Sequence, residues 1–183
     1  MVESSGQHNI EGFLARLNGE SPRSRILLEA GLLEELLRKA IFNRLAKNKS
    51  SEDLFGKKCS LGLAVLAKYA HALGLVGEHE VTALKRFADA RNKIAHSWHA
   101  DFSDDEIQKI ANSIQLINIV GEQAMLPHQR CFSRLDYLGA YLSEEFLNRF
   151  ANMPPTAFGG GVFLSSIVVD PTTDSRTKKV SSR

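Results

Sequence analysis

The sequence is short of cysteine and has no long hydrophobic run, and each shortage removes a class of protein. Only two cysteines, Cys59 and Cys131, occur in 183 residues, so at most one disulfide can form. A chain of this size does not depend on a disulfide, and we expect two free thiols. No apolar run approaches the roughly 18 residues of a membrane span, and the first residues lack the basic and apolar regions of a signal peptide. We therefore expect a cytoplasmic protein that does not cross a membrane.

An excess of charge of one sign is also lacking. The net charge is +2, but the residues from Pro171 onward carry +3, which leaves −1 for the rest of the chain. A nearly neutral body does not create the positive field of a dedicated DNA-binding domain. The sequence also contains no helix-turn-helix and no basic recognition helix. We therefore predict that the chain does not bind duplex DNA specifically.

What the sequence does contain is a strong helical pattern in a globular composition, with 43% hydrophobic and 24% charged residues. The first long helix is predicted from Pro22 to about Lys47. Ser21 is suited to cap its start, and a proline at the first helical position loses no hydrogen bond. Apolar residues follow at helical spacing: Ile26, Leu27, Ala30, Leu33, Leu37, Ala40 and Ile41, widened by Leu28, Leu32 and Leu36. So broad an apolar face predicts a central helix that packs on more than one side.

Four further helices are predicted along the chain. They cover about 61–73, about 77–96, about 103–117, and a last stretch from about 133 to 151 after a break at Pro127. Gly74 is placed to end the second of the five helices, and Ser103 with Glu106 predicts a capping box at the fourth. Residues 48–60 are predicted to form a polar connection. The pattern favours an all-α fold, an up-and-down bundle of four to five main helices.

The predicted organisation has four parts. An N-terminal extension covers residues 1–20, the helical domain covers 21–122, and an additional helix packed on the bundle covers 123–153. Residues 154–183 form a Gly/Pro-rich and basic tail. In that tail, 162–169 have the composition of one edge strand, and the rest is predicted to be flexible.

Arg91 stands out on the predicted helix 77–96. At about 100° per residue, it falls in the middle of the apolar arc that contains Leu84, Phe87 and Ile94. A guanidinium in such an arc is costly unless it is paired, or unless the arc opens onto a cleft or a partner. Asn92 and His96 lie four residues apart at the margin of this arc. The last turns of the helix therefore combine a cationic fork, an amide and an imidazole.

Three interpretations of this group remain open from the sequence. In the first, Arg91 is structural and pairs with a carboxylate of the central helix, Glu34 or Glu35. In the second, Arg91 holds a phosphate and His96 transfers a proton, because arginine binds phosphate through two bonds and histidine titrates near neutrality. In the third, the group forms a cleft for a small anion or a partner.

Metal chemistry is not predicted at this group. His96 and His99 have a spacing that is seen in metal sites, and Asp101 lies nearby, but no fourth ligand has a suitable position. The sequence shows no phosphate-binding loop either, since the three glycines at 159–161 follow two prolines and precede no helix. We therefore expect neither a metal nor a cofactor.

A longer pattern links the chain to a known family. The stretches that carry it are residues 21–25, 34–35, 54–56, 61–62, 69–75, 91–97 and 102–107, in this order. Over about 21–113, roughly half of the chain, the sequence resembles the mannitol operon repressor family, a relative of the HEPN helical domains. The resemblance implies an all-α fold and a regulatory role, and it does not extend beyond about Gln123.

The HEPN relationship carries a second implication for the same residues. An arginine, four residues and a histidine, with a polar residue directly after the arginine, is similar to the motif of HEPN ribonucleases. In that superfamily two protomers face each other across a shared cleft, and cleavage needs no metal. The resemblance would make Arg91 the phosphate-holding residue, His96 the residue that acts on the ribose 2′-hydroxyl or the leaving group, and Asn92 the residue that orients them.

From the sequence, the first prediction is a regulatory protein that acts through protein contacts, as a homodimer and without a DNA-reading motif of its own. The alternative is a metal-independent HEPN-type endoribonuclease, with RNA as its substrate and Arg91, Asn92 and His96 as its catalytic group. The surroundings of Arg91 distinguish the two. A buried Arg91 that forms a salt bridge with Glu34 or Glu35 favours the regulatory protein, and an exposed pair of Arg91 and His96 that faces a dimer partner favours the enzyme.

Overall fold

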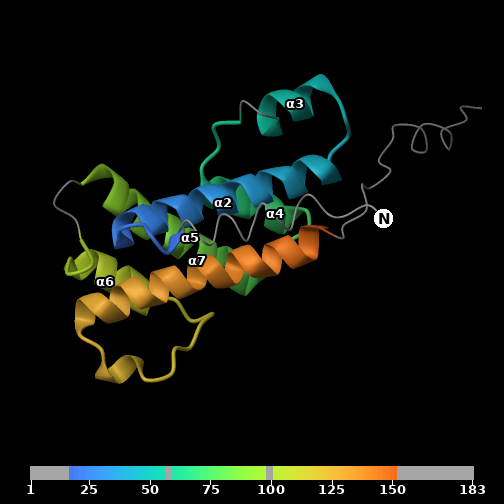
Figure 1. The fold of residues 1–183 in the computed structure, drawn as a ribbon. Coiled ribbons are helices and arrows are strands. Elements are labelled where there is room, and N and C mark those ends of the chain that lie inside the picture. Colours follow the sequence, from blue (N-terminus) through green and yellow to red (C-terminus); the bar gives the residue numbers. More distant parts are fainter. Residues whose placement is uncertain (1–16, 57–58, 98–100, 152–183) are drawn as a thin grey trace, which may run out of the picture.

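The structure is a computed structural model of the 183-residue chain, and it describes residues 17–56, 59–97 and 101–151. These residues form a helical fold without strands (Figure 1), which confirms the all-α prediction. The elements are α2 (Pro22–Arg44), α3 (Lys49–Phe55), α4 (Leu63–Ala72), α5 (Glu78–His96), α6 (Asp105–Asn112), a short 3-10 helix (Glu122–Ala124) and α7 (Pro127–Ala151). None of the described helices is both long and apolar enough to cross a membrane. The predicted strand at 162–169 lies outside the described residues.

Helix α2 begins as the sequence predicts. The Ser21 Oγ accepts a hydrogen bond from the Ser24 backbone N–H at 3.2 Å, and Pro22 occupies the first turn. The buried residues of the helix include most of the predicted apolar stripe: Ile26, Ala30, Leu33, Leu37, Ala40 and Ile41. Leu28, predicted to widen that stripe, is exposed instead. The core therefore lies along one broad face of α2, and the opposite edge meets solvent.

The connection after α2 differs from the prediction. Residues 48–60 were predicted to be a polar connection, and this is wrong for 49–55, which form α3. Asn48 caps the helix through its side chain, which accepts from the Ser51 N–H at 3.0 Å, and the Ser51 Oγ accepts from the Asn48 N–H at 3.2 Å. The last residue of α3, Phe55, is buried and meets Tyr69 of α4 edge to face, with ring centroids 5.2 Å apart. The reciprocal cap and one aromatic contact hold a helix too short for a periodic pattern.

The turn between α4 and α5 confirms the predicted role of Gly74. Its φ is +68°, a left-handed conformation that favours glycine. Its N–H donates to the His71 carbonyl at 2.9 Å, and the Leu75 N–H donates to the Ala70 carbonyl at 2.8 Å, so two carbonyls at the end of α4 are satisfied. Helix α5 follows with the predicted bounds, which places Arg91 and His96 in its last turns.

The start and the end of α6 correct two predictions. Its N-cap is Asp104, whose Oδ1 accepts from the Glu106 and Ile107 N–H groups, so the capping box of Ser103 and Glu106 is wrong. The helix ends at Asn112, although Ile114 is still buried beyond it.

A buried arginine explains the early end of α6. The Arg134 Nε donates to the Ala111 carbonyl at 3.0 Å, and the Nη2 group of the same side chain donates to the Ile114 carbonyl. The guanidinium gives the Ile114 carbonyl a donor and adds a second one to the Ala111 carbonyl, which also accepts from the Ile114 N–H, so the chain leaves the helix with both carbonyls bonded.

Helix α7 begins at Pro127, and the prediction of a break there with a start near residue 133 is wrong. Proline suits the first turn because its missing N–H has no helical partner at that position. The Leu126 carbonyl accepts from the Arg130 N–H at 2.9 Å, and the Gln129 side chain accepts from the Leu126 N–H at 3.2 Å. These bonds begin the helix directly at the proline.

The packing order departs from strict up-and-down alternation. Helix α2 packs most extensively against α7, and Figure 1 shows the two side by side and running the same way. Helix α5 runs opposite to α2, because the Arg23 side chain reaches the Ser97 carbonyl while Arg91 approaches Glu34. In strict alternation the first and third predicted helices would run the same way. One apolar cluster extends from Ile26 of α2 to Phe146 of α7.

Helices α2 and α7 approach closely at a buried carboxyl group. Glu29 is only 1% exposed. No described residue donates a hydrogen bond to either oxygen of its carboxylate. Arg25 and Asp136 lie beside it and form an ion pair at 2.7 Å. Gly139 leaves the space that Glu29 fills, because a Cβ at this glycine would lie 2.2 Å from the Glu29 Oε2. We call Arg25, Glu29, Asp136 and Gly139 the α2–α7 seam.

Two glycine substitutions are expected to change stability in opposite directions. Gly139→Ala should lower the free energy of unfolding by about 1–3 kcal/mol, because the new methyl group overpacks a buried contact. Gly31→Ala, in α2, should raise it by about 0.5–1 kcal/mol, because alanine favours the helix and its Cβ would meet nothing within 4 Å. Urea unfolding of both variants measures the difference. Shifts of the same sign would contradict the close approach at the seam.

Candidate functional site

The last turns of α5 are held between the start of α2 and the start of α6. The Arg23 Nη2 group in α2 donates to the Ser97 carbonyl at 3.2 Å, directly after α5. On the other side Lys93 forms an ion pair with Glu106 of α6. The hydrogen bond to Glu106 raises the pKa of the Lys93 ammonium, so the lysine stays charged and carries its own counterion. The end of α5 is therefore fixed on two sides.

Arg91 reaches out of the apolar arc in which the helical wheel places it. Its side chain is 31% exposed, although its Nε is buried and has no partner among the described residues. The Nη1 group donates to the Asn92 Oδ1 at 3.0 Å, and the Nη2 group lies 4.0 Å from the Glu34 Oε1. The expectation of a buried guanidinium is thus corrected: the aliphatic stem is covered, and the charged end reaches the surface between α5 and α2.

The two carboxylates proposed as partners have different roles. Glu34 faces Arg91 and also accepts the Leu63 backbone N–H at 3.1 Å, so it joins α2 to the start of α4 as well as to α5. Glu35 faces away and pairs with residues of its own helix, Arg38 at 2.7 Å and Lys39 at 3.1 Å. Glu35 is therefore not the partner of Arg91, because it lies about 100° further around α2.

His96 lines an open depression of about 450 Å³ together with Asn92, Lys93, Ser97, Asp104 and Glu106. Arg91 is not among the lining residues. Five residues along a helix correspond to a rotation of about 140° between the two side chains. The structure therefore places Asn92 and His96 at the depression, and Arg91 adjoins it only through the hydrogen bond to Asn92.

Other chemistry is limited around this depression. The described residues contain no group of three or more histidine, cysteine or acidic side chains placed to hold a metal ion. Trp98 and His99 lie outside the described residues. The distance between the His96 and His99 side chains is therefore not part of the description of this site. Both cysteines are free thiols, as predicted, and burial raises the pKa of the Cys131 thiol to about 12. Such a thiol is not a nucleophile near neutral pH.

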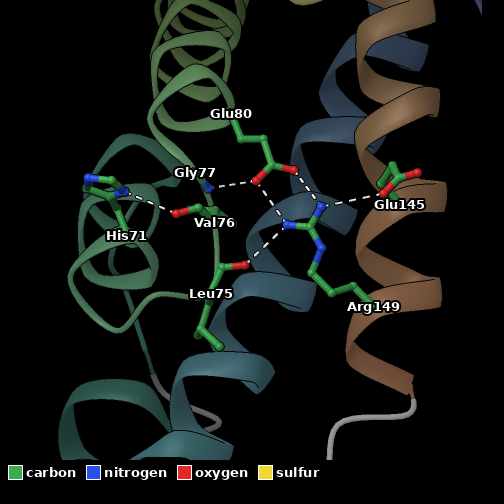
Figure 2. A network of polar contacts seen from close by, with 7 residues as sticks. All are labelled: His71, Leu75, Val76, Gly77, Glu80, Glu145 and Arg149. Carbon is green, nitrogen blue, oxygen red and sulfur yellow. Dashed lines mark hydrogen bonds and ion pairs between the residues drawn. The ribbon is translucent and has the colours of Figure 1, made fainter.

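A polar network that the sequence analysis did not identify lies at the other end of α5 (Figure 2). Arg149 in the last turns of α7 bonds both carboxylate oxygens of Glu80, at 2.9 and 2.8 Å, and reaches the Leu75 carbonyl at 3.2 Å. Glu80 also accepts from the Gly77 N–H at 2.7 Å, which caps α5. A glutamate three residues after a helix start is a capping signal, but its arginine partner comes from a distant part of the chain. The network fixes the end of α7 at the turn between α4 and α5.

The comparisons with known proteins return no relative for this chain. No family model, no curated protein and no solved structure matches it. The relationship to the mannitol operon repressor and HEPN families therefore stays a prediction from the sequence stretches described above.

Proposed function

We propose that this chain is a helical regulatory protein, similar to the mannitol operon repressor family, that acts through protein contacts and neither cleaves RNA nor reads duplex DNA. One observation carries the proposal. Arg91 is not among the residues that line the depression with His96, and its guanidinium donates to Asn92 and approaches Glu34 of α2. The group that resembles a catalytic motif thus serves as a junction between α5 and α2.

The physical argument concerns charge as well as direction. A phosphate-holding arginine and a proton-transferring histidine must reach the same phosphodiester within hydrogen-bond distance. In this chain a carboxylate already faces the guanidinium, and Glu106 neutralises the lysine beside His96. Two acidic residues, Asp104 and Glu106, also line the depression and would repel a polyanion. These features favour a structural role for Arg91.

One observation favours the alternative, a metal-independent endoribonuclease. Asn92 and His96 are both exposed and line one open depression at the end of a helix. A second copy of the chain could supply the guanidinium that this depression lacks. The homodimer predicted from the sequence would be needed for that arrangement, and it remains a prediction.

Incubation with RNA separates the two functions. We expect the wild-type protein to leave labelled single-stranded RNA uncut, with or without EDTA. Arg91→Ala should lower the free energy of unfolding by only about 1 kcal/mol, because a partly exposed ion pair is screened by solvent. His96→Ala should be milder still. Arg86→Ala is the matched control, since Arg86 is an exposed arginine of the same helix.

The opposite result is equally specific. The endoribonuclease function is supported, and the regulatory function is contradicted, by two results together. The wild type must cut RNA in EDTA, and Arg91→Ala and His96→Ala must each lower the cleavage rate by about 10²- to 10⁴-fold. Arg86→Ala would then have to keep the wild-type rate, and all variants would have to melt near the wild-type temperature. That pattern would show catalysis by this pair rather than a loss of fold or of general charge.

A further inference from the structure

One face of α4 exposes a row of large apolar side chains. Val65, Tyr69 and Leu73 follow each other at intervals of four residues, so they share one face of the helix, and they are 40%, 44% and 37% exposed. Leu54 of α3 is 52% exposed and adjoins Phe55, whose ring meets that of Tyr69. We call Leu54, Val65, Tyr69 and Leu73 the α4 row. Such an exposed group of apolar side chains indicates a contact surface.

The α4 row is too small for a stable interface between two copies of the chain. Such an interface buries about 800 Å² on each partner and involves 20–30 residues a side. The row offers four side chains, each about half covered already. Its size suits a short apolar segment of fewer than ten residues instead.

The last described helix ends near one end of this row. Helix α7 ends at Ala151, and Arg149 binds the Leu75 carbonyl and Glu80, which fixes the last turns of α7 against the turn after α4 (Figure 2). Leu73, at one end of the row, is two residues before Leu75. Ten residues, 152–161, can span up to about 33 Å, whereas the row extends only about 12 Å along α4.

The segment that follows these ten residues has matching chemistry. Residues 162–169 are apolar at six of eight positions: Val162, Phe163, Leu164, Ile167, Val168 and Val169. Beyond them the chain carries the net charge of +3 from Pro171 onward. On the body, Glu52 and Asp53 are exposed on α3 directly before Leu54. Residues 162–169 can therefore reach the apolar α4 row. The basic residues that follow this segment can reach the acidic side chains of Glu52 and Asp53 beside the row.

We propose that residues 162–169 pack on the α4 row of the same chain, with the basic residues that follow beside Glu52 and Asp53. The chain then covers its own exposed apolar face. The inference goes beyond the proposed function, because it concerns a contact within the chain, and it is independent of the role of Arg91.

Protease cleavage in the full chain tests this arrangement. Chymotrypsin cuts after aromatic residues, and mass spectrometry identifies the product that ends at Phe163. We expect this cleavage to be about tenfold faster in Tyr69→Glu than in the wild type, because cleavage follows the fraction of segment that is undocked. Tyr137→Glu is the matched control: Tyr137 is a 51% exposed tyrosine on α7 outside the row, and it should leave the rate unchanged.

A second variant removes the complication that Tyr69 also contacts Phe55. Ile167→Asp changes only the segment, and it should accelerate cleavage after Phe163 to a similar extent while the melting temperature of the helical body stays near the wild-type value. Equal cleavage rates in wild type, Tyr69→Glu and Ile167→Asp would overturn the proposal. Protection that increases with protein concentration would also overturn it, because the segment would then come from a second copy.

Discussion

Arg134→Met is expected to lower the free energy of unfolding by about 3–5 kcal/mol, the cost typical of breaking a buried ion pair. Arg134 is 8% exposed and binds both carboxylate oxygens of Glu122, at 2.9 and 2.7 Å. It also donates to the carbonyls of Ala111 and Ile114 at the end of α6. Methionine fills a similar volume but donates no hydrogen bond, so it leaves a largely buried carboxylate and the Ile114 carbonyl without the donors that Arg134 supplies, while the Ala111 carbonyl keeps the Ile114 N–H.

Urea unfolding at neutral pH measures this effect, and a neighbouring arginine provides the control. Arg130 of α7 bonds two carbonyls in the same loop, those of Glu122 and Met125, but pairs with no carboxylate in the described structure. Arg130→Met should therefore cost only about 1 kcal/mol. Adding Glu122→Met to Arg134→Met should recover part of the loss, since it removes the unpaired charge. Equal costs for the two arginines would refute a special role for Arg134.

Glu29→Gln is expected to stabilise the protein by roughly 3 kcal/mol at pH 7. Burial, together with the nearby charge of Asp136, raises the pKa of the Glu29 carboxyl to about 9, and the opposing effect of Arg25 is smaller. The folded state therefore holds a proton that the unfolded chain releases above its ordinary pKa of 4.5. Stability is greatest below pH 4.5 and is lost progressively as the pH rises towards 9. Glutamine keeps the shape and carries no proton to lose.

The measurement is urea unfolding at pH 5, 7 and 9. The wild type should lose stability at each step, and Glu29→Gln should lose much less, so the gap between them widens with pH. Glu35→Gln is the matched control, because Glu35 lies on the same helix and pairs with Arg38 and Lys39 near the surface. That variant should be neutral or slightly destabilising at every pH. A gap for Glu29→Gln that is independent of pH would show that the buried carboxyl does not titrate as described.

The helices that the sequence predicted correctly have strong local signals. The start of α2 is set by a capping serine and a proline, and the end of α4 by a glycine with a positive φ. Helix α5 combines a long apolar period with a clear first turn, and its observed bounds match the predicted ones. These signals lie within a few residues of the feature they determine, so they can be read without knowing what the helix packs against.

The predictions failed where the local signal was short or ambiguous. Helix α3 has only seven residues, which is too few to show a repeating apolar stripe, and the signal for its start is the capping side chain of Asn48. Pro127 was interpreted as a break, although a proline can equally begin a helix, and the Gln129 side chain that supports this start gives no periodic signal. In both places the capping side chain carried the information and the hydrophobic pattern did not.

The candidate site shows a different limit. The helical wheel identified Arg91 as a charge in an apolar arc, and the same test would have found Glu29, which lies between Ile26 and Leu33 on α2 and is far more buried. The test cannot supply partners. That Glu34 rather than Glu35 faces Arg91 depends on the rotation of α2 against α5, and that Asp136 faces Glu29 depends on a helix more than 100 residues away. Packing between distant helices decides these contacts.

The pairing of the first and last long helices also determines when the chain can finish folding during synthesis. Arg25 and Asp136 of the α2–α7 seam are 111 residues apart in sequence. At about 5–20 residues per second, the ribosome needs roughly 5 to 20 seconds to add the second member after the first. For that time the apolar face of α2 that packs on α7 has no native cover, and closing so long a loop is slow in itself. Nascent chains of this protein should therefore be substrates for a ribosome-associated chaperone until α7 has emerged.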